Sequence, residues 1–105
     1  KDTTDDVLYV KDVVTMYVPN SFSPDGDGIN EFFKPVGHGI DENFYTFMVF
    51  DRYGKMLFIT NDYEEGWDGT FEGKRCSMGS YTYEIFYRDT EGIKRKLFGG
   101  IELLR

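Results

Sequence analysis

Apolar and polar side chains alternate along much of the chain with a period of two residues, which is typical of β-strands with one face in a core. Residues 81–88 give the clearest example, because three tyrosines and Ile85 share one face while mainly polar residues share the other. Residues 89–92 contain the aspartate and glycine of a tight turn, and residues 93–98 resume the strand pattern. The whole segment predicts a β-hairpin.

A second hairpin is predicted from residues 45–50 and 56–59, which flank a turn at 51–55. Gly54 suits the left-handed position of a type I turn followed by a bulge. Both strands are apolar on both faces. This is expected of strands that are covered on two sides or that lie at an interface.

Further strands are predicted at 15–18 and 32–36, and helix signals are nearly absent. Gly99 and Gly100 interrupt the last strand before residues 101–104, which predicts a bulge or a switch between sheets at that point. Short strands at this spacing predict an all-β fold, and they favour a two-sheet sandwich over a barrel.

The length of 105 residues fits one small domain. The strand pattern assigns that domain to residues 15–105. Residues 1–14 are acidic and poor in turns, and we interpret them as a linker or as the end of a preceding domain. The sequence begins at Lys1 instead of a methionine, which favours a piece of a longer polypeptide. No apolar run approaches the roughly 20 residues of a membrane helix, so no transmembrane segment is expected.

The formal net charge of −7 has the wrong sign for a surface that follows nucleic-acid phosphates. Nucleic acid is therefore not an expected partner. Residues 1–73 hold five basic and fifteen acidic side chains, whereas residues 74–105 hold seven basic and four acidic ones, so the two parts carry −10 and +3. This asymmetry is compatible with one acidic and one basic surface.

Residues that carry chemistry are sparse. Cys76 is the only cysteine, which excludes an intrachain disulfide and argues against a cysteine-based zinc site. His38, the only histidine, lies between two glycines and is interpreted as an exposed loop residue. The sequence shows no order of serine, histidine and aspartate typical of a catalytic triad and no glycine-rich phosphate loop. An enzyme is therefore not expected.

The segment 23–31 has the oxygen spacing of a calcium loop. Ser23, Asp25, Asp27 and Glu31 fall at the first, third, fifth and ninth positions of such a loop. The twelfth position holds Lys34 instead of a bidentate glutamate, so the segment supplies at best half a site. No cofactor is otherwise expected. The alternative is a turn whose carboxylates accept hydrogen bonds from backbone amides.

Trp67 is the only tryptophan, and it lies in a glycine-flanked segment with Asp68 and Gly69. If exposed, Trp67 would offer a platform on which a sugar ring can stack. If buried, it would close one end of the core while Asp68 fixes the following turn. The buried, structural interpretation is favoured for a tight turn around one aromatic residue.

Four sequence blocks occur in an order that resembles a known family. They are VPNSFSPDGDGINEFFKP at 18–35, FDRYGKMLF at 50–58, GWDGTFEGK at 66–74 and MGSYTY at 78–83. Together they resemble the gliding-motility-associated C-terminal domain, which is the type B sorting domain of the type IX secretion system in Bacteroidota. The blocks cover most of the chain after residue 16, and they are specific in combination.

The resemblance implies an immunoglobulin-like, two-sheet antiparallel sandwich of about seven strands. It also implies an address rather than a catalyst, with N-terminal cargo domains fused before it. Its partners would be the type IX translocon and outer-membrane components, and the cargo would pass through the periplasm to the cell surface or the medium. The competing hypothesis is an extracellular immunoglobulin-like module that binds calcium or glycan.

Loops on a rigid sandwich are the expected recognition surface for such machinery. The structural alternative for each loop residue is maintenance of the fold. A second candidate is strand addition to the edge offered by residues 101–104. The candidate recognition residues are Pro19, Asn20, Phe22, Pro24, Asp25, Gly26, Asp27, Gly28, Arg52, Gly54, Trp67, Asp68 and Gly69.

Overall fold

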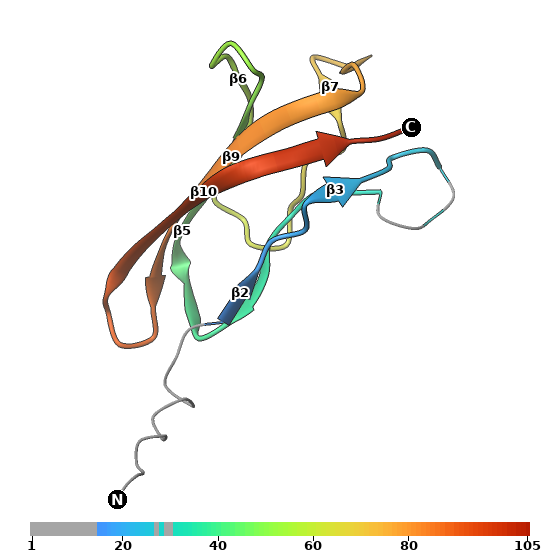
Figure 1. The fold of residues 1–105 in the computed structure, drawn as a ribbon. Helices are drawn as coiled ribbons and strands as arrows, with labels where there is room; N and C mark the ends of the chain where they lie inside the picture. Colours follow the sequence, from blue (N-terminus) through green and yellow to red (C-terminus); the bar gives the residue numbers. More distant parts are fainter. Residues whose placement is uncertain (1–14, 27, 29–30) are drawn as a thin grey trace, which may run out of the picture.

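The computed structural model describes residues 15–26, residue 28 and residues 31–105 (Figure 1). This part of the chain contains strands and no helix, so the predicted all-β class is confirmed. Residues 1–14, interpreted as a linker, lie outside the described residues. The strands are β2 (Thr15–Tyr17), β3 (Ser21–Phe22), β4 (Val36–His38), β5 (Ile40–Phe50), β6 (Met56–Thr60), β7 (Thr70–Phe71), β8 (Lys74–Arg75), β9 (Gly79–Asp89) and β10 (Lys94–Leu103).

Five strands form the main sheet in the order β3-β10-β9-β5-β6. The pairs β10–β9, β9–β5 and β5–β6 are antiparallel. The pair β3–β10 is parallel, with Glu102 opposite Ser21 and Leu103 opposite Phe22. The expected sandwich therefore contains one parallel pair, which needs no hairpin because β3 reaches β10 from a distant part of the chain.

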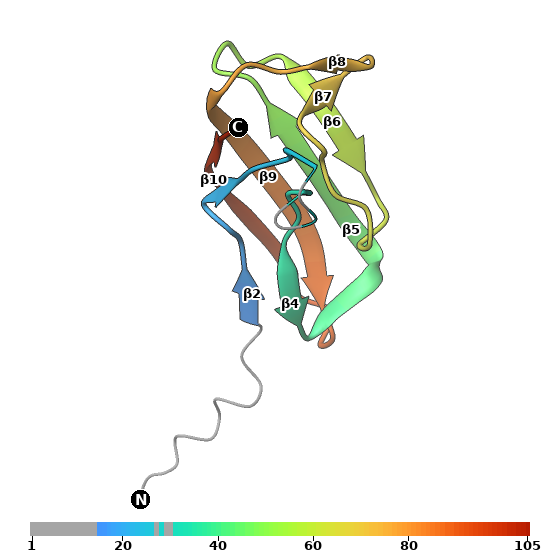
Figure 2. The ribbon, with the colours of Figure 1, turned by 90° about the vertical axis from the view of Figure 1, so that its right-hand side faces the viewer.

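A second layer covers one face of the main sheet and completes the sandwich. Figure 2 shows β4 and the segment leading to β7 in front of β9 and β5, with β2 beside β4. The strands β2 and β4 pair with each other, as do β7 and β8. The core lies between the layers and is rich in aromatic rings. Its buried apolar residues are Phe22, Phe33, Tyr45, Phe47, Val49, Trp67, Tyr81, Ile85, Tyr87, Ile101 and Leu103. This arrangement confirms the immunoglobulin-like sandwich.

Both predicted hairpins are present. In β9, Tyr81, Ile85 and Tyr87 are buried while Thr82 and Phe86 on the opposite face are exposed, so the period-two pattern identified the core face. The β5–β6 hairpin turns through Gly54, whose φ of 88° lies in the left-handed region. The amide of Gly54 donates to the carbonyl oxygen of Asp51, and the amide of Asp51 donates to that of Lys55, which is the pattern of the predicted type I turn with a bulge at Gly54. A separate register shift lies before the turn, between Val49 and Phe50.

The strand predicted at residues 32–36 and the loop predicted around His38 differ from the structure. Residues 32–36 do not form a strand; Phe33 makes an isolated bridge to Trp67, and the strand starts at Val36. His38 is exposed, as predicted, but it ends β4 instead of lying in a loop.

The prediction of a bulge or sheet switch at Gly99 and Gly100 was wrong. The strand β10 pairs with β9 in continuous register from Lys94 to Leu103. A Cβ atom at Gly99 would lie 2.8 Å from the hydroxyl oxygen of Tyr83. Glycine is therefore needed at position 99 to make room for a cross-strand ring and not to bend the strand.

Candidate recognition surface

The segments that carry the sequence motifs meet at one end of the sandwich. In Figure 1 the β3 loop and the C-terminus lie at the right, close to β7, while the β5–β6 turn lies at the top of the same end. We call this the motif end. It is bounded by the segments 19–26, 51–55, 66–70 and 76–81 and by Arg105.

Arg105 joins three of these segments through their backbone carbonyls. One guanidinium nitrogen, Nη2, donates to the carbonyl oxygens of Gly69 at 3.2 Å and Cys76 at 2.9 Å. The other terminal nitrogen, Nη1, donates to the carbonyl oxygen of Pro24 at 3.5 Å. A planar guanidinium can satisfy several carbonyls at fixed directions. Arg105 therefore links segments that are far apart in the sequence; we call these three hydrogen bonds the Arg105 bracket.

Gly69 lies at the crossing point of the same segments. Its φ is +84°, and an added Cβ atom would lie 3.1 Å from Cγ of Pro24 and 3.2 Å from Cδ1 of Leu103. Both conditions exclude a larger side chain without local rearrangement. The glycine of this motif is thus explained by the close approach of two other chain segments.

Trp67 is 1% exposed, so the structural interpretation is confirmed and the sugar-platform interpretation is wrong. Its ring packs against Phe22 at 5.5 Å and Tyr81 at 5.2 Å between centroids, and its Nε1 donates to the carbonyl oxygen of Thr70. Phe22, another candidate recognition residue, is also buried. Neither side chain is available to contact a partner, because both lie in the aromatic core beneath the loops.

The backbone around Trp67 is held from both sides. Trp67 exchanges two backbone hydrogen bonds with Phe33, at 2.8 and 2.9 Å. Asp68 is exposed, and its Oδ1 accepts hydrogen bonds from the amide and the hydroxyl of Thr70. This is the turn-fixing role that the sequence predicted for Asp68.

The carboxylate of Glu31 binds the glycines of the 23–31 segment. Its Oε1 accepts a hydrogen bond from the Gly26 amide at 3.0 Å, and its Oε2 accepts one from the Gly28 amide at 2.7 Å. Both glycines have positive φ values, 87° and 83°. These contacts match the alternative in which a carboxylate satisfies the backbone amides of the turn.

Calcium binding by Ser23, Asp25, Asp27 and Glu31 stays a prediction. Asp27 lies outside the described residues, so the full set of candidate ligands is not defined. Within the described part of the chain, no group of three or more His, Cys, Asp or Glu side chains is placed to hold a metal ion. Lys34, at the twelfth loop position, lies 3.5 Å from a carboxylate oxygen of Glu64.

The β5–β6 turn is fixed by Asp51, whose Oδ1 accepts hydrogen bonds from the amides of Tyr53 and Lys55. Arg52 and Tyr53 project at its tip, and Tyr53 is 84% exposed. A hollow of about 190 Å³ separates this tip from the segment 77–81 that leads into β9. The Arg52 motif and the Trp67 motif therefore flank the same stretch of chain, since Tyr81 also packs on Trp67.

The candidate recognition residues divide by exposure. Pro19 and Pro24 are half-buried, and Gly69 is buried like Phe22 and Trp67. Asp27 lies outside the described residues. Among the described candidates, those exposed to a partner are Asn20, Asp25, Gly26, Gly28, Arg52, Gly54 and Asp68.

Strand addition at residues 101–104 does not fit the structure. On one side β10 pairs with β9 as far as Leu103. On the other side the amide of Glu102 donates to the carbonyl oxygen of Asn20, and the amide of Leu104 donates to that of Phe22. Both sides of this segment are occupied, so it offers no free edge.

The sequence analysis missed Arg105 as a structural residue. A single arginine after an apolar pair carries no motif, and its partners are carbonyls that any residue could supply. Cys76, one of those partners, has a thiol whose pKa is raised chiefly by burial, with Arg105 acting in the opposite direction. A thiol that holds its proton is a poor nucleophile, which agrees with a structural role for this half-buried residue.

Comparison with known proteins first defines the class of fold. CopC from Methylosinus trichosporium OB3b is similar in its crystal structure, with a TM-score of 0.57 and 9% sequence identity. The similarity covers 85% of this chain and 88% of CopC. At this identity the likeness concerns the fold alone. No curated protein matches the sequence.

The family model of the CHU_C type IX secretion signal domain matches residues 16–101. The chain belongs to this family. The resemblance drawn from the four sequence blocks is thereby confirmed, and the domain is a secretion signal of the type IX system that implies export to the cell surface or the medium. The described residues include no helix with the length and apolar character needed to cross a bilayer.

Proposed function

We propose that this domain is the sorting signal of a larger cargo protein and that the motif end is the surface read by the type IX translocon and its outer-membrane components. The observation that carries the proposal is the family match together with the meeting of its motif segments at one end of the sandwich. A signal must present one shape on many different cargoes. Loops braced by Arg105, Gly69 and the buried Trp67 supply such a constant shape.

The exposed residues of the motif end supply the contacts. The carbonyl oxygen of Asn20 accepts a hydrogen bond from the amide of Glu102. The carboxylate of Asp68 accepts one from the amide of Thr70. Arg52 lies at the tip of a turn fixed by Asp51. The buried motif residues Phe22 and Trp67 pack in the core below these loops and fix the loop conformation. The domain thus functions as an address, and no step of catalysis is assigned to it.

The position of β2 fits a cargo fused before the domain. Thr15 pairs with His38, and β2 starts at the end of the sandwich away from the motif end (Figure 1). We propose that residues 15–105 form the sorting unit and that residues 1–14 connect it to the cargo. A cargo attached there leaves the motif end accessible during passage through the periplasm.

A reporter fusion tests the proposal. The chain is placed behind a signal peptide and a folded fluorescent protein, and fluorescence is measured at the cell surface and in the medium of strains with intact or deleted type IX machinery. We expect export only with intact machinery. Periplasmic retention in both strains, with the domain folded, would contradict the proposed role.

A further inference from the structure

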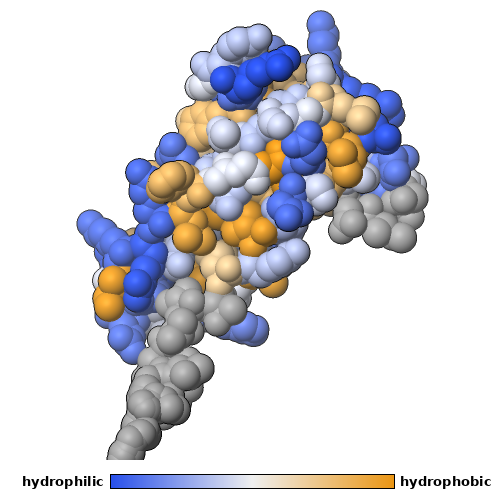
Figure 3. All heavy atoms as spheres, in the orientation of Figure 1, coloured by the Kyte–Doolittle hydropathy of each residue, from blue (hydrophilic) through white to orange (hydrophobic). Residues whose placement is uncertain are grey.

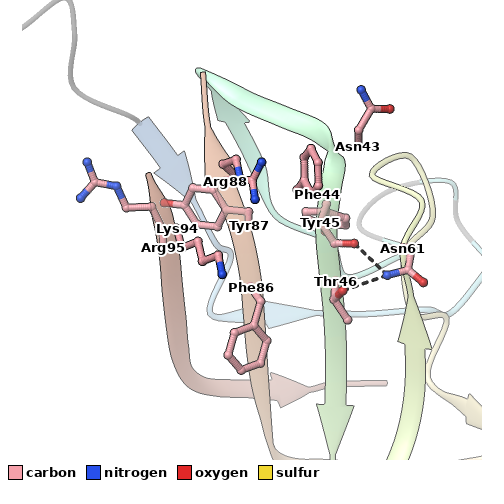
Figure 4. Close-up of a pocket in the computed structure, with 10 residues that line it drawn as sticks. All are labelled: Asn43, Phe44, Tyr45, Thr46, Asn61, Phe86, Tyr87, Arg88, Lys94 and Arg95. Carbon is pink, nitrogen blue, oxygen red and sulfur yellow. Dashed lines mark hydrogen bonds between the residues drawn. The ribbon is translucent and has the colours of Figure 1, made fainter. Parts of the chain in front are cut away.

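A hollow of about 420 Å³ lies on the outer face of the main sheet, which no described strand covers (Figure 4). Phe44 and Thr46 line it from β5, Phe86 and Arg88 from β9, and Lys94 from β10. Asn61 closes one side, and its side-chain nitrogen donates to the carbonyl oxygen of Tyr45 and to the hydroxyl of Thr46. The hollow is therefore shaped by strands and not by the motif loops.

Positive charges on this face rest on aromatic rings. The guanidinium of Arg88 lies 3.8 Å from the ring centroid of Phe44. The ammonium of Lys96 lies 5.4 Å from the ring of Phe86 and 5.6 Å from that of Phe98. Such contacts hold the cations in place while leaving N–H groups available to a carboxylate. We call Phe44, Phe86, Arg88, Lys94, Lys96 and Phe98 the basic aromatic strip.

Carboxylates adjoin part of the strip, because Asp41 lies opposite Arg88 and Glu84 lies opposite Phe98 in the strand register. No carboxylate lines the hollow, and among the described residues neither Arg88 nor Lys94 forms an ion pair. The Nε of Arg88 is buried and has no hydrogen-bond partner. Arg95 differs, because it lies 3.2 Å from a carboxylate oxygen of Asp89.

The strip adjoins a side of β10 with which no described strand pairs before Glu102. The amide of Glu102 points away from β9, towards Asn20. Amides of an antiparallel strand alternate between its two sides, so the amides of Gly100, Phe98 and Lys96 point the same way. The described strand β3 pairs with this side only at Glu102 and Leu103. The remainder can accept an extended chain.

We propose that the basic aromatic strip and the open side of β10 dock an extended acidic peptide segment of a partner protein. Its carboxylates meet Lys94 and Lys96, its apolar side chains meet Phe98, and its backbone pairs with β10. Alternate side chains of an added strand fall on the outer face of the sheet, where the strip lies.

Two other occupants fit less well. A second copy of the domain would place the cations of one strip against those of the other, and lysines on an edge strand oppose self-pairing for the same reason. A glycan would stack on the rings, yet it could not pair with the row of β10 amides. The open side of β10 therefore favours a peptide. This inference does not rest on the sorting role proposed above.

The test is a titration of the full chain with fluorescently labelled peptides, followed by anisotropy. The probe is a short peptide in which glutamate and valine take turns at every second position, with serine between them, so that both side-chain types fall on one face of the added strand. Its matched control replaces glutamate by glutamine. We expect the acidic peptide to bind more tightly and to weaken as salt rises. K94E and K96E should each weaken binding about fivefold, the scale of an exposed ion pair, while K74E on β8 should have no such effect.

Further outcomes would overturn the proposal. Equal binding of the glutamine peptide would mean that carboxylates are not recognised, and equal binding of an amide-methylated acidic peptide would exclude pairing with β10. Binding of polygalacturonate without binding of the acidic peptide would assign the face to a glycan. Absence of peptide binding, with the domain folded by circular dichroism, would contradict docking altogether.

Discussion

At the motif end, Gly69, Pro24 and Leu103 approach one another closely, and the Arg105 side chain bridges backbone carbonyls. At the opposite end, β9 and β10 are joined by a regular turn at Gly92, where a Cβ atom would meet nothing within 4 Å. Figure 3 shows hydrophilic residues gathered around this β9–β10 turn, at the lower left. The first end depends on close contacts between segments that are distant in the sequence. The second depends on a local turn in which the buried Asp89 carboxylate accepts hydrogen bonds from the amides of Glu91 and Ile93.

The largest difference between the ends is expected from alanine at the two glycines. Gly69 and Gly92 have nearly equal φ values, +84° and +85°. G92A carries only the cost of a left-handed alanine, about 1 kcal/mol. G69A adds close contacts with Pro24 and Leu103, for a total of about 3 kcal/mol. Urea unfolding measures both, and equal losses would contradict the crossing-point role of Gly69.

Loss of the Arg105 bracket should be smaller. R105Q removes the hydrogen bonds that the guanidinium donates to three backbone carbonyls. Because the side chain is largely exposed, we expect the free energy of unfolding to fall by about 1 kcal/mol. K74Q, an exposed cation on β8, is the control and should change stability by less than about 0.5 kcal/mol. If thermal melts of the two variants coincide, Arg105 does not hold the segments together.

At the β9–β10 turn, Asp89 gives the domain an acid-sensitive contact. The backbone amide of Ile93 is the main cause of a lowered Asp89 pKa, followed by contributions that include the Glu91 amide and Arg95. Because the folded pKa lies below the unfolded value of about 3.9, the stabilisation is present above about pH 4 and is lost as pH falls through the folded pKa.

Two variants check this contact by urea unfolding between about pH 6 and pH 3. D89N should lose less stability on acidification than the native chain. R95Q, which keeps the amide bonds, should fall between the two. An unchanged acid response in D89N would show that Asp89 is not the sensitive group.

The smallest effect is expected from calcium. The carboxylate of Glu31 accepts hydrogen bonds from the amides of Gly26 and Gly28. If this is its role, added calcium should leave the melting temperature unchanged, and E31Q should lower the melting temperature. A ligand that binds only the folded state raises the melting temperature by mass action. A calcium-dependent rise that D27N abolishes would establish the metal site instead.

The sequence predicted those features that depend on local pattern. The β5–β6 and β9–β10 hairpins follow from alternation and turn chemistry, and the burial of Trp67 follows from its glycine-flanked turn. The displaced strand at 32–36 and the misread glycines at 99–100 have another cause. Phe33 is positioned by its bridge to Trp67, and glycine is needed at position 99 because of the Tyr83 ring. Both partners lie on distant segments, and the alternation of apolar and polar residues does not predict where those segments lie.

The same limit applies to the surfaces. The motif residues were recognisable, but whether each faces solvent or core depends on the packing of the second layer, which buried Phe22 and left Asn20 exposed. The sequence analysis placed an open strand edge at residues 101–104, although β3 pairs with this segment. The pairing is parallel, so no hairpin turn in the sequence indicates it. The basic aromatic strip depends on register between three strands and has no motif of its own.

Export of two reporter fusions tests the central claim most directly. One carries N20S and R52Q at the motif end, and the other carries K94Q and K96Q on the basic aromatic strip; thermal melts first establish that both domains fold. The account predicts that the motif-end variant loses most of its machinery-dependent export while the strip variant keeps it. Normal export of the motif-end variant, with the strip variant retained in the periplasm, would contradict the assignment of the recognition surface.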